Sequence, residues 1–140
     1  MDPIDNSYNW AELSYRIYME KKLKNEFHSL IPIFKYVYID GENNYEEGID
    51  SKLQNLNFDT LFQRNWYSGS DIFLEQNRLI IGFEHNFYNA SNGNERYFSL
   101  GRAFFRNKEN NLNNNSSKKS AIVTDFKANL SGHLKINSSL

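Results

Sequence analysis

The sequence predicts an α+β fold in which a mixed central sheet is flanked by helices. Residues 10–30 contain neither glycine nor proline, and their apolar side chains gather on one broad side of a helical wheel, which predicts a long helix. Residues 33–40 alternate aromatic and β-branched side chains, and residues 70–86 contain two strand-like runs. Residues 94–109 again follow helical spacing, and residues 121–126 read as a short strand. The predicted element order is therefore α-β-β-β-α-β.

Length, charge and composition restrict the classes of function. A chain of 140 residues suits one hydrophobic core, so residues 1–140 are expected to form a single domain. The net charge of −1 gives no overall attraction to nucleic acid, so such binding requires a local patch. The absence of cysteine excludes disulfides, thiolate zinc sites and cysteine nucleophiles. No apolar run approaches membrane-spanning length and the N-terminus is too polar for a signal peptide, which predicts a cytoplasmic protein without membrane contact.

Glu20 lies inside the apolar side of the predicted first helix, between Arg16 and Lys24. One interpretation is that the stems of these side chains are buried while their charged ends reach solvent. The other is that this edge of the helix borders a polar site. The sequence leaves both open, and Pro32 is expected to end the helix.

Two polar segments are expected to carry little regular structure. Residues 107–120 are rich in asparagine and serine and are predicted to form a disordered or mobile loop. Residues 131–140 are expected to be either weakly structured or an edge strand of the sheet.

The two strand-like runs on either side of Gln76 and Asn77 are predicted to form a hairpin with a two-residue turn. In this register Asp71 and Glu84 become diagonal neighbours about 7–8 Å apart, and their carboxylates can converge on one cation. Gly82 lies opposite Asp71 and leaves space there. The other face is entirely apolar and is expected to be core; it carries Ile72, Leu74, Leu79, Ile81 and Phe83.

A plainer interpretation of the polar face is a surface in contact with water. Glu75 and Arg78 would then form a surface ion pair, and the other acids would be solvated. A register shift of one residue would place Asp71 and Glu84 on opposite faces, because side chains alternate along a strand.

The segment SDIFLEQNRLIIGFEHN resembles the metal-binding hairpin of the PD-(D/E)XK nucleases, in which an Asp begins one strand and an acid-x-Lys tripeptide ends the next. ERYFSLGRAFFRNKE looks like the helix that follows this hairpin, and SAIVTDF stands where the next strand of the sheet belongs. The layout is similar to that of heterocyst excision-controlling-factor proteins. The resemblance covers residues 10–126 in element order and implies a restriction-endonuclease-like sheet.

The resemblance also implies a site for one or two Mg²⁺ or Mn²⁺ ions. Asp71 and Glu84 would hold the metal together with the backbone carbonyl of His85. Glu20 would match the acid that the first helix often supplies. Asn86 stands in place of the family's lysine, so it can position a water by hydrogen bonds but cannot supply the positive charge.

Four arginines are expected to neutralise the phosphates of a bound nucleic acid, with DNA as the expected partner; they are Arg64, Arg78, Arg102 and Arg106. Arg102 and Arg106 share one face of the predicted second helix, and Arg102 replaces the glutamine of the family's pattern. Each arginine alone is equally compatible with an ordinary surface position.

These features predict a divalent-metal-dependent nuclease that hydrolyses phosphodiester bonds of DNA. The missing lysine leaves a second interpretation, a catalytically inactive member of the fold that binds nucleic acid or regulates a partner. A third is a small interaction protein of the immunity or defence-accessory kind. The sequence leaves open whether the chain acts alone, as a homodimer or with a partner subunit.

Overall fold

The computed structural model describes residues 9–40, 52–68, 77–106, 119–130 and 134–139. Within these ranges the chain forms antiparallel strands and one short helix, so the predicted α+β fold with flanking helices is wrong. The elements are β1 (Asn9–Arg16), β2 (Met19–Leu23), β3 (Glu26–Asp40), β4 (Lys52–Leu53), α1 (Phe58–Leu61), β5 (Tyr67–Ser68), β6 (Arg78–Asn89), β7 (Asn94–Phe105), β8 (Val123–Leu130) and β9 (Leu134–Ser139).

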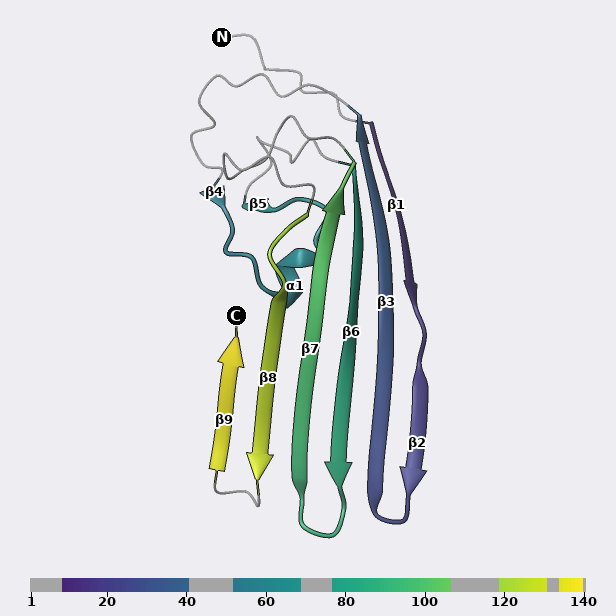
Figure 1. Ribbon diagram of the computed structural model, residues 1–140, viewed down its shortest axis with the longest axis vertical. Helices are drawn as coiled ribbons and strands as arrows, with labels where there is room; N and C mark the ends of the chain where they lie inside the picture. The colour runs from purple at the N-terminus through teal and green to yellow at the C-terminus, as the bar shows by residue number, and fades with distance from the viewer. Residues whose placement is uncertain (1–8, 41–51, 69–76, 107–118, 131–133, 140) are drawn as a thin grey trace.

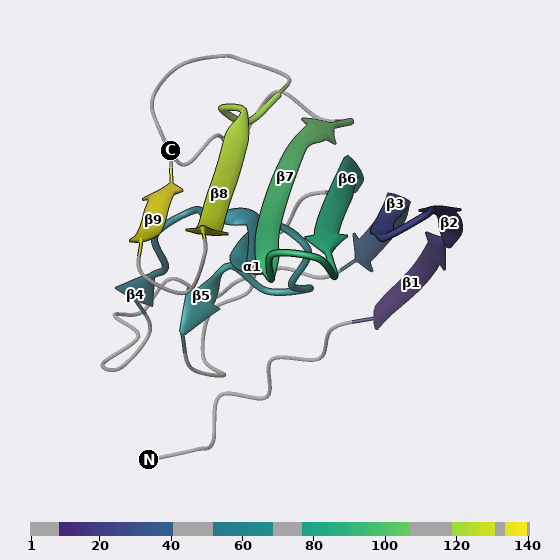
Figure 2. The same cartoon turned by 90° about the horizontal axis from the view of Figure 1, so that it is seen from below.

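Seven of these strands form one antiparallel sheet in the order β1-β3-β6-β7-β8-β9, with β2 paired to β3 (Figure 1). β1 and β2 lie end to end along the same edge of β3. β4 and β5 form a separate two-stranded sheet. Figure 2 shows that the large sheet is curved and that α1 lies on its concave side. The two faces of the sheet are therefore called concave and convex below.

Residues 10–30 form β1, β2 and the start of β3 instead of the predicted helix. Their sequence also fits a period of two, since Leu13 and Tyr15 face the convex side while Glu12 faces the concave side. The helical period and the strand period both bring apolar side chains of this segment onto one side. The sheet decides between them, because β3 gives the backbone of β1 and β2 a hydrogen-bonding partner along its whole length.

Pro32 does not end an element but lies in the middle of β3. It stands opposite the break between β1 and β2, formed by Ile17 and Tyr18, where the ladder needs no N–H donor from β3. The Pro32 carbonyl accepts a hydrogen bond from the Ile17 amide at 3.1 Å. Lys24, at φ 47, and Asn25 make the tight turn from β2 to β3.

β7 takes the place of the helix predicted at residues 94–109. Its concave-facing residues Ser99, Gly101 and Ala103 are small and buried, and they alternate with larger convex-facing residues. Gly101 is paired directly with Gly82 of β6. The small side chains leave room for α1 on the concave side, so the apolar residues of this segment follow the strand period.

The predicted hairpin is also wrong, because both edges of β6 are occupied by other strands. Arg78, the first residue of β6, is paired with Val37 of β3 and with Phe105 of β7, and pairing continues along the whole strand. Asn77 instead accepts a hydrogen bond from the Ile39 amide at its side-chain oxygen, at 2.7 Å. Asp71 and Gln76 lie outside the described residues.

The two faces of β6 are reversed relative to the prediction. Ile80, expected on the outer face, is fully buried on the concave side. Leu79 and Ile81, expected in the core, face the convex side and are 40% and 38% exposed.

The hydrophobic core lies between the concave face and residues 54–66. The sheet and this segment both contribute buried side chains, namely Val37, Ile39, Ile80, Ala103 and Val123 from or beside the strands, and Leu61 and Trp66 from the segment. Phe58 of α1 completes a second cluster with Ile31 and Ile33.

Other predictions from the sequence have mixed outcomes. The strand at residues 33–40 is confirmed within β3, the strand at residues 121–126 overlaps β8, and the tail forms the edge strand β9. Residues 107–118 of the predicted loop lie outside the described residues, while Lys119 forms an isolated bridge with Phe104. That residues 1–140 form a single domain stays a prediction.

Candidate functional site

The convex face of the sheet carries rows of exposed apolar side chains. Residues paired across the strands lie in one row, and successive rows on one face are two residues apart. One row crosses β1, β3, β6 and β7 and consists of Leu13, Tyr36, Leu79 and Phe104, each at least 38% exposed. Along β3 this face runs from Leu30 to Tyr38, a length of about 27 Å at about 3.4 Å per residue. The chain thus presents a broad apolar band.

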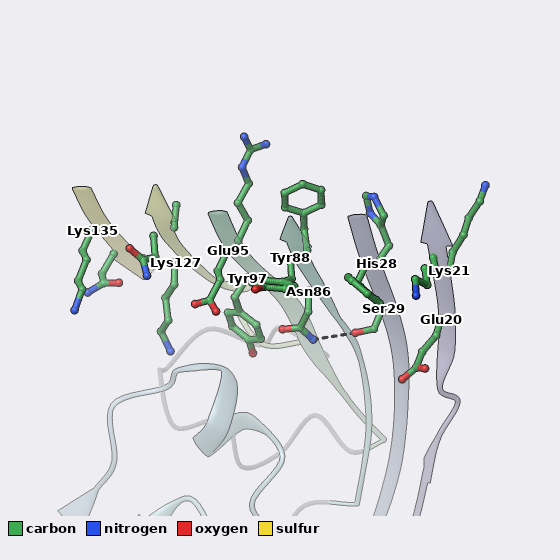
Figure 3. Close-up of a pocket in the computed structure, with 17 residues that line it drawn as sticks. Glu20, Lys21, His28, Ser29, Asn86, Tyr88, Glu95, Tyr97, Lys127 and Lys135 are labelled. Carbon is green, nitrogen blue, oxygen red and sulfur yellow. Dashed lines mark hydrogen bonds between the residues drawn. The ribbon is translucent and has the colours of Figure 1, made fainter. Parts of the chain in front are cut away.

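A row of different composition follows this band near the β2–β3 and β6–β7 turns. It contains Lys21, His28, Phe87 and Arg96. The Arg96 guanidinium lies 5.3 Å from the ring centroid of Phe87, and the His28 ring approaches the same phenyl edge-on at 5.0 Å. Figure 3 shows Lys21 and His28 pointing away from the side of α1. The apolar band therefore ends at a row that carries positive charge.

A pocket of about 770 Å³ lies at the same end of the sheet and opens on the concave face (Figure 3). Its concave lining comes from β2, β3, β6, β7, β8 and β9 and combines polar side chains with the rings of Phe27 and Tyr88. The other members are Glu20, Lys22, Ser29, Asn86, Glu95, Tyr97, Lys127, Asn129, Lys135 and Asn137. Three lysines and two glutamates contribute to this lining, and Lys127 is paired with Asp125, so the pocket suits a polar ligand that carries both hydrogen-bonding and charged groups.

Local contacts orient the side chains of the pocket. Asn86 Nδ2 donates to Ser29 Oγ at 3.1 Å. Lys127 Nζ lies 3.1 Å from Asp125 Oδ2 and 5.2 Å from the ring centroid of Tyr97. The hydrogen bond to Asp125 raises the pKa of Lys127, and burial raises the pKa of Tyr97. At neutral pH the pocket therefore offers a charged ammonium, a neutral phenol and an oriented amide.

Beyond the pocket, residues 54–66 cover the concave face and enclose a buried arginine. Arg78 is fully buried, and its Nη2 donates to the backbone carbonyls of Gln63, at 2.7 Å, and Arg64. Its guanidinium lies 4.9 Å from the ring centroid of Trp66.

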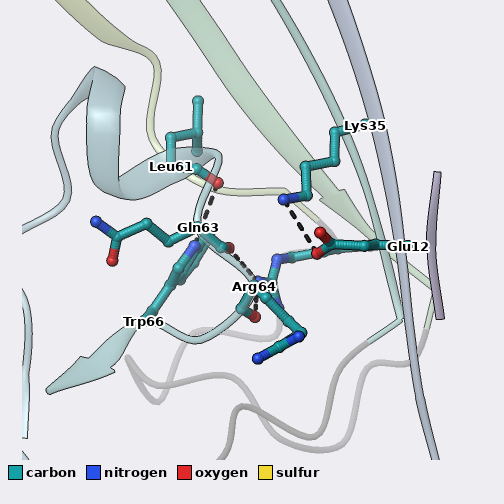
Figure 4. Close-up of polar contacts among 7 residues, drawn as sticks. Glu12, Lys35, Leu61, Gln63, Arg64 and Trp66 are labelled. Carbon is teal, nitrogen blue, oxygen red and sulfur yellow. Dashed lines mark hydrogen bonds and ion pairs between the residues drawn. The ribbon is translucent and has the colours of Figure 1, made fainter. Parts of the chain in front are cut away.

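The charges near this arginine keep it protonated. Burial lowers the pKa of Arg78 to about 10, and the negative charge of Glu12 opposes this shift. Glu12 itself pairs with Lys35, whose Nζ lies 3.2 Å from Glu12 Oε2 (Figure 4). Arg78 is therefore a cation at neutral pH, held by backbone carbonyls and an aromatic ring.

The predicted metal ligands are only partly brought together. Glu84 and Asn86 lie on the concave face as neighbours along β6, but Glu84 forms an ion pair with Arg16, 3.5 Å from Nη1 to Oε1. Glu20 lies in the row next to Glu84, on β2 rather than on a helix. His85 points to the convex face. Asp71, the first ligand of the proposed set, falls outside the described residues.

The four predicted nucleic-acid-binding arginines do not form one surface. Arg78 is buried on the concave face, whereas Arg102 faces the convex side and donates from Nε to the Ser120 carbonyl at 2.8 Å. Arg64 stacks on Trp10, with its guanidinium carbon 3.8 Å from the ring centroid. Arg106 follows β7, and its amide donates to the Asn77 carbonyl at 3.0 Å.

Searches for two further kinds of site gave negative results in the described ranges. No group of three or more histidine or acidic side chains there could hold a metal ion. Binding of Mg²⁺ or Mn²⁺ by a set that includes Asp71 stays a prediction. The helical part of these ranges contains no segment long and apolar enough to cross a membrane.

A sheet whose convex face is apolar, and whose concave face carries a polar pocket beside the covered core, directs attention to proteins that handle amphiphilic molecules. The sequence model of the LPS transport system D family matches residues 8–140. The chain belongs to this family. A comparison with curated protein sequences gave no match.

Membership of the LPS transport system D family overturns the functional predictions. The resemblance to PD-(D/E)XK nucleases is wrong, and neither a nuclease, an inactive nuclease-fold protein nor a defence-accessory protein is supported. DNA as the partner is wrong for the same reason. The predicted cytoplasmic location without membrane contact is wrong as well, because the family is one of outer-membrane proteins.

The sequence analysis missed the apolar band, although a signal for it was present. On β3 the concave-facing Ile33, Val37 and Ile39 alternate with the convex-facing Phe34 and Tyr36, so both faces of the strand are apolar. Such a strand needs an apolar cover on both sides. Residues 54–66 cover only one of them.

Proposed function

We propose that the chain takes part in the transport of lipopolysaccharide (LPS), with its convex face against lipid acyl chains and its concave face toward the sugars of LPS. The observation that carries this proposal is the family match over residues 8–140, which includes every strand of the two-faced sheet. LPS has an apolar and a polar, phosphorylated part, and the sheet separates apolar from polar groups in the same way.

The convex band suits contact with acyl chains in size and composition. Its extent of about 27 Å along β3 is close to the hydrocarbon thickness of a bilayer, about 30 Å. Removing its side chains from water stabilises the protein by about 25 cal/mol for each Å² of apolar surface covered. The cationic row with Lys21 and Arg96 at one end lies where lipid phosphates would meet the band.

The concave pocket suits a phosphorylated sugar. Lys127 and Lys135 supply positive charge for phosphate, while Asn86 and the neutral phenol of Tyr97 supply donors and acceptors for hydroxyl groups. Tyr97 and Tyr88 also contribute aromatic rings to the lining. Polar sites of this kind orient a ligand by a few fixed groups.

Site-specific photo-crosslinking in cells tests this proposal. A photoreactive amino acid at Tyr97, in the pocket, should form an adduct with LPS, and the same group at Ile81, on the convex face, should form adducts with lipid acyl chains. Ile80, which lies on the concave side but is fully buried under residues 54–66, is the matched control and should form neither adduct.

Two results would contradict the proposal. LPS adducts that are absent at Tyr97 but present at Ile81 would show that the faces are assigned wrongly. A complete absence of LPS adducts at Tyr97 and at neighbouring pocket positions, in cells that export LPS, would show that the concave face does not meet this substrate.

A further inference from the structure

The concave lining of the pocket runs across the strands rather than along them. Two neighbouring rows of side chains form it. One row extends from Glu20 on β2 to Asn137 on β9, and the other extends from Lys22 to Lys135 on the same two strands. Each row crosses the intervals between six strands, about 24 Å in all, whereas the two rows are only about 7 Å apart. This lining therefore matches an elongated ligand that lies across the strands.

The positive charge available to a ligand is concentrated at the β9 end of the pocket. Lys135, on β9, forms no ion pair with any of the described residues. The charge of Lys127, on β8, is largely balanced by Asp125, whose Oδ2 lies 3.1 Å from Nζ. Glu95 on β7 and Glu20 on β2 repel a phosphate from the middle and from the opposite end. A phosphate group is therefore expected next to Lys135.

The opposite half of the pocket carries two aromatic rings. Phe27 of β3 and Tyr88 of β6 are directly paired, with ring centroids 6.1 Å apart. These residues are 40% and 42% exposed, and Lys22 Nζ lies 5.1 Å from the ring centroid of Phe27. Rings surrounded by polar side chains suit a sugar, because its C–H groups pack against a ring while its hydroxyl groups form hydrogen bonds at the sides.

Uncharged polar groups connect the two halves. Asn86 and Tyr97 are directly paired between the aromatic rings and the lysines. Asn86 Nδ2 donates to Ser29 Oγ at 3.1 Å, which orients the amide. Burial raises the pKa of Tyr97, so its phenol stays neutral and can both donate and accept hydrogen bonds. Figure 3 shows Tyr97, Lys127 and Lys135 projecting to the same side of the sheet. Hydroxyl groups of one ligand can thus be bound along the whole row.

We propose that the pocket binds a phosphorylated oligosaccharide laid across the strands, with a sugar ring against Phe27 and Tyr88 and a phosphate at Lys135. This inference rests on the proposed function for the source of the oligosaccharide, which is the polar part of LPS. It adds the direction of the saccharide and its two points of attachment. A saccharide that lay along the strands would reach only one of them.

Isothermal titration calorimetry on the full chain tests the phosphate end. The ligands are the saccharide of LPS, freed of its acyl chains by alkaline hydrolysis, and the same saccharide after phosphatase treatment. The detergent must have a head group without sugar. One phosphorylated saccharide should bind per chain. Lys135→Gln should weaken its binding at least about tenfold and leave the dephosphorylated saccharide unaffected.

Lys24→Gln is the matched control for this charge. Lys24 lies in the β2–β3 turn and does not line the pocket, so its substitution removes the same charge from the same end of the sheet. It should leave the binding of both saccharides unchanged.

Phe27→Leu tests the aromatic end. It should weaken the binding of both saccharides about threefold or more, because both keep the sugar rings. Phe34→Leu is the matched control, since Phe34 lies on the convex face of the same strand and is 41% exposed. Should Phe27→Leu fail to fold, Tyr88→Leu removes the neighbouring ring and should give the same loss.

The distance between the two ends makes the pair of substitutions a test of direction. Phe27 on β3 and Lys135 on β9 are separated by four strand intervals, about 19 Å. A single bound saccharide that loses affinity in both variants must therefore cross the strands. Glucose 6-phosphate, which is too short to do so, should be weakened by Lys135→Gln and not by Phe27→Leu.

The outcomes separate the crosswise site from the proposed function. An unchanged affinity in Lys135→Gln, or an equal loss for both saccharides, would overturn the phosphate end. An unchanged affinity in Phe27→Leu, or an equal loss in Phe34→Leu, would overturn the crosswise placement. LPS adducts at Tyr97 in cells, without saccharide binding by calorimetry, would overturn this site alone. The predicted losses without LPS adducts in cells would support the site and overturn the proposed function.

Discussion

Replacing Ile80 and Ile81 one at a time by alanine should show which face of β6 is the core. Each substitution removes three carbon atoms, a transfer term of about 2.4 kcal/mol at about 0.8 kcal/mol per CH₂ group. Ile80 is fully buried between the sheet and residues 54–66, so its substitution loses the whole transfer free energy and leaves a cavity. Ile80→Ala should therefore lower the free energy of unfolding by about 2–5 kcal/mol.

Ile81→Ala is the matched comparison on the opposite face. Ile81 is 38% exposed and its substitution leaves no closed cavity, so Ile81→Ala should lower the free energy of unfolding by about 1.5 kcal/mol or less. Urea-induced unfolding, followed by the fluorescence of the buried Trp66, measures both values in the same buffer with lipid or detergent. An equal loss for both variants, or a larger loss for Ile81→Ala, would refute the assignment of faces.

Three further predictions address the close contact at Gly82, the helix cap and a surface ion pair. Gly82→Ala should lower the free energy of unfolding by about 1–3 kcal/mol, because the new Cβ would lie 2.8 Å from a backbone oxygen and from a phenyl carbon. Gly93→Asn, at φ +70 with open space around it, should change that free energy by less than about 0.5 kcal/mol, and similar losses at the two glycines would contradict the close contact at Gly82. Asn57→Ala removes the N-cap of α1 and should cost about 0.5–2 kcal/mol, visible as faster hydrogen exchange of the α1 amides; unchanged exchange would count against the cap. Asp125→Asn should cost less than about 1 kcal/mol at pH 7, since Lys127 is largely exposed. The pair raises the pKa of Lys127, so its contribution is complete below the unfolded pKa of 10.5 and is lost as the pH rises through the higher folded pKa; a loss that persists at pH 12 in thermal unfolding would contradict this origin.

The choice between helix and strand at residues 10–30 shows one limit of sequence reasoning for this protein. Leu13 and Ile17 fit a helical stripe, and Leu13 and Tyr15 fit an alternating strand. Local spacing alone does not separate these periods. The strand is selected because the backbone of β1 pairs with β3, which lies further along the chain. A pattern within residues 10–30 does not reveal this pairing.

The sequence predicted one part of the candidate site and missed another. Glu84 and Asn86 were correctly expected to share one face, because alternation along β6 fixes that relation. The partner of Glu84, however, is Arg16 rather than a metal-binding acid. That pair joins residues from two strands that do not touch each other, and only the order β1-β3-β6 brings them within reach.

The sequence by itself determined the strand at residues 33–40 and the strand-like character of residues 121–126, because alternation and turn residues act locally. For the tail it left two alternatives, weak structure or an edge strand, and the structure shows the edge strand β9. Only the tertiary structure decided which face of β6 is buried. The run Leu79-Ile80-Ile81 is apolar on both sides, so hydropathy does not distinguish core from exterior. The choice was made by Gly82 and its partner in β7, because these glycines let residues 54–66 approach and cover the concave face.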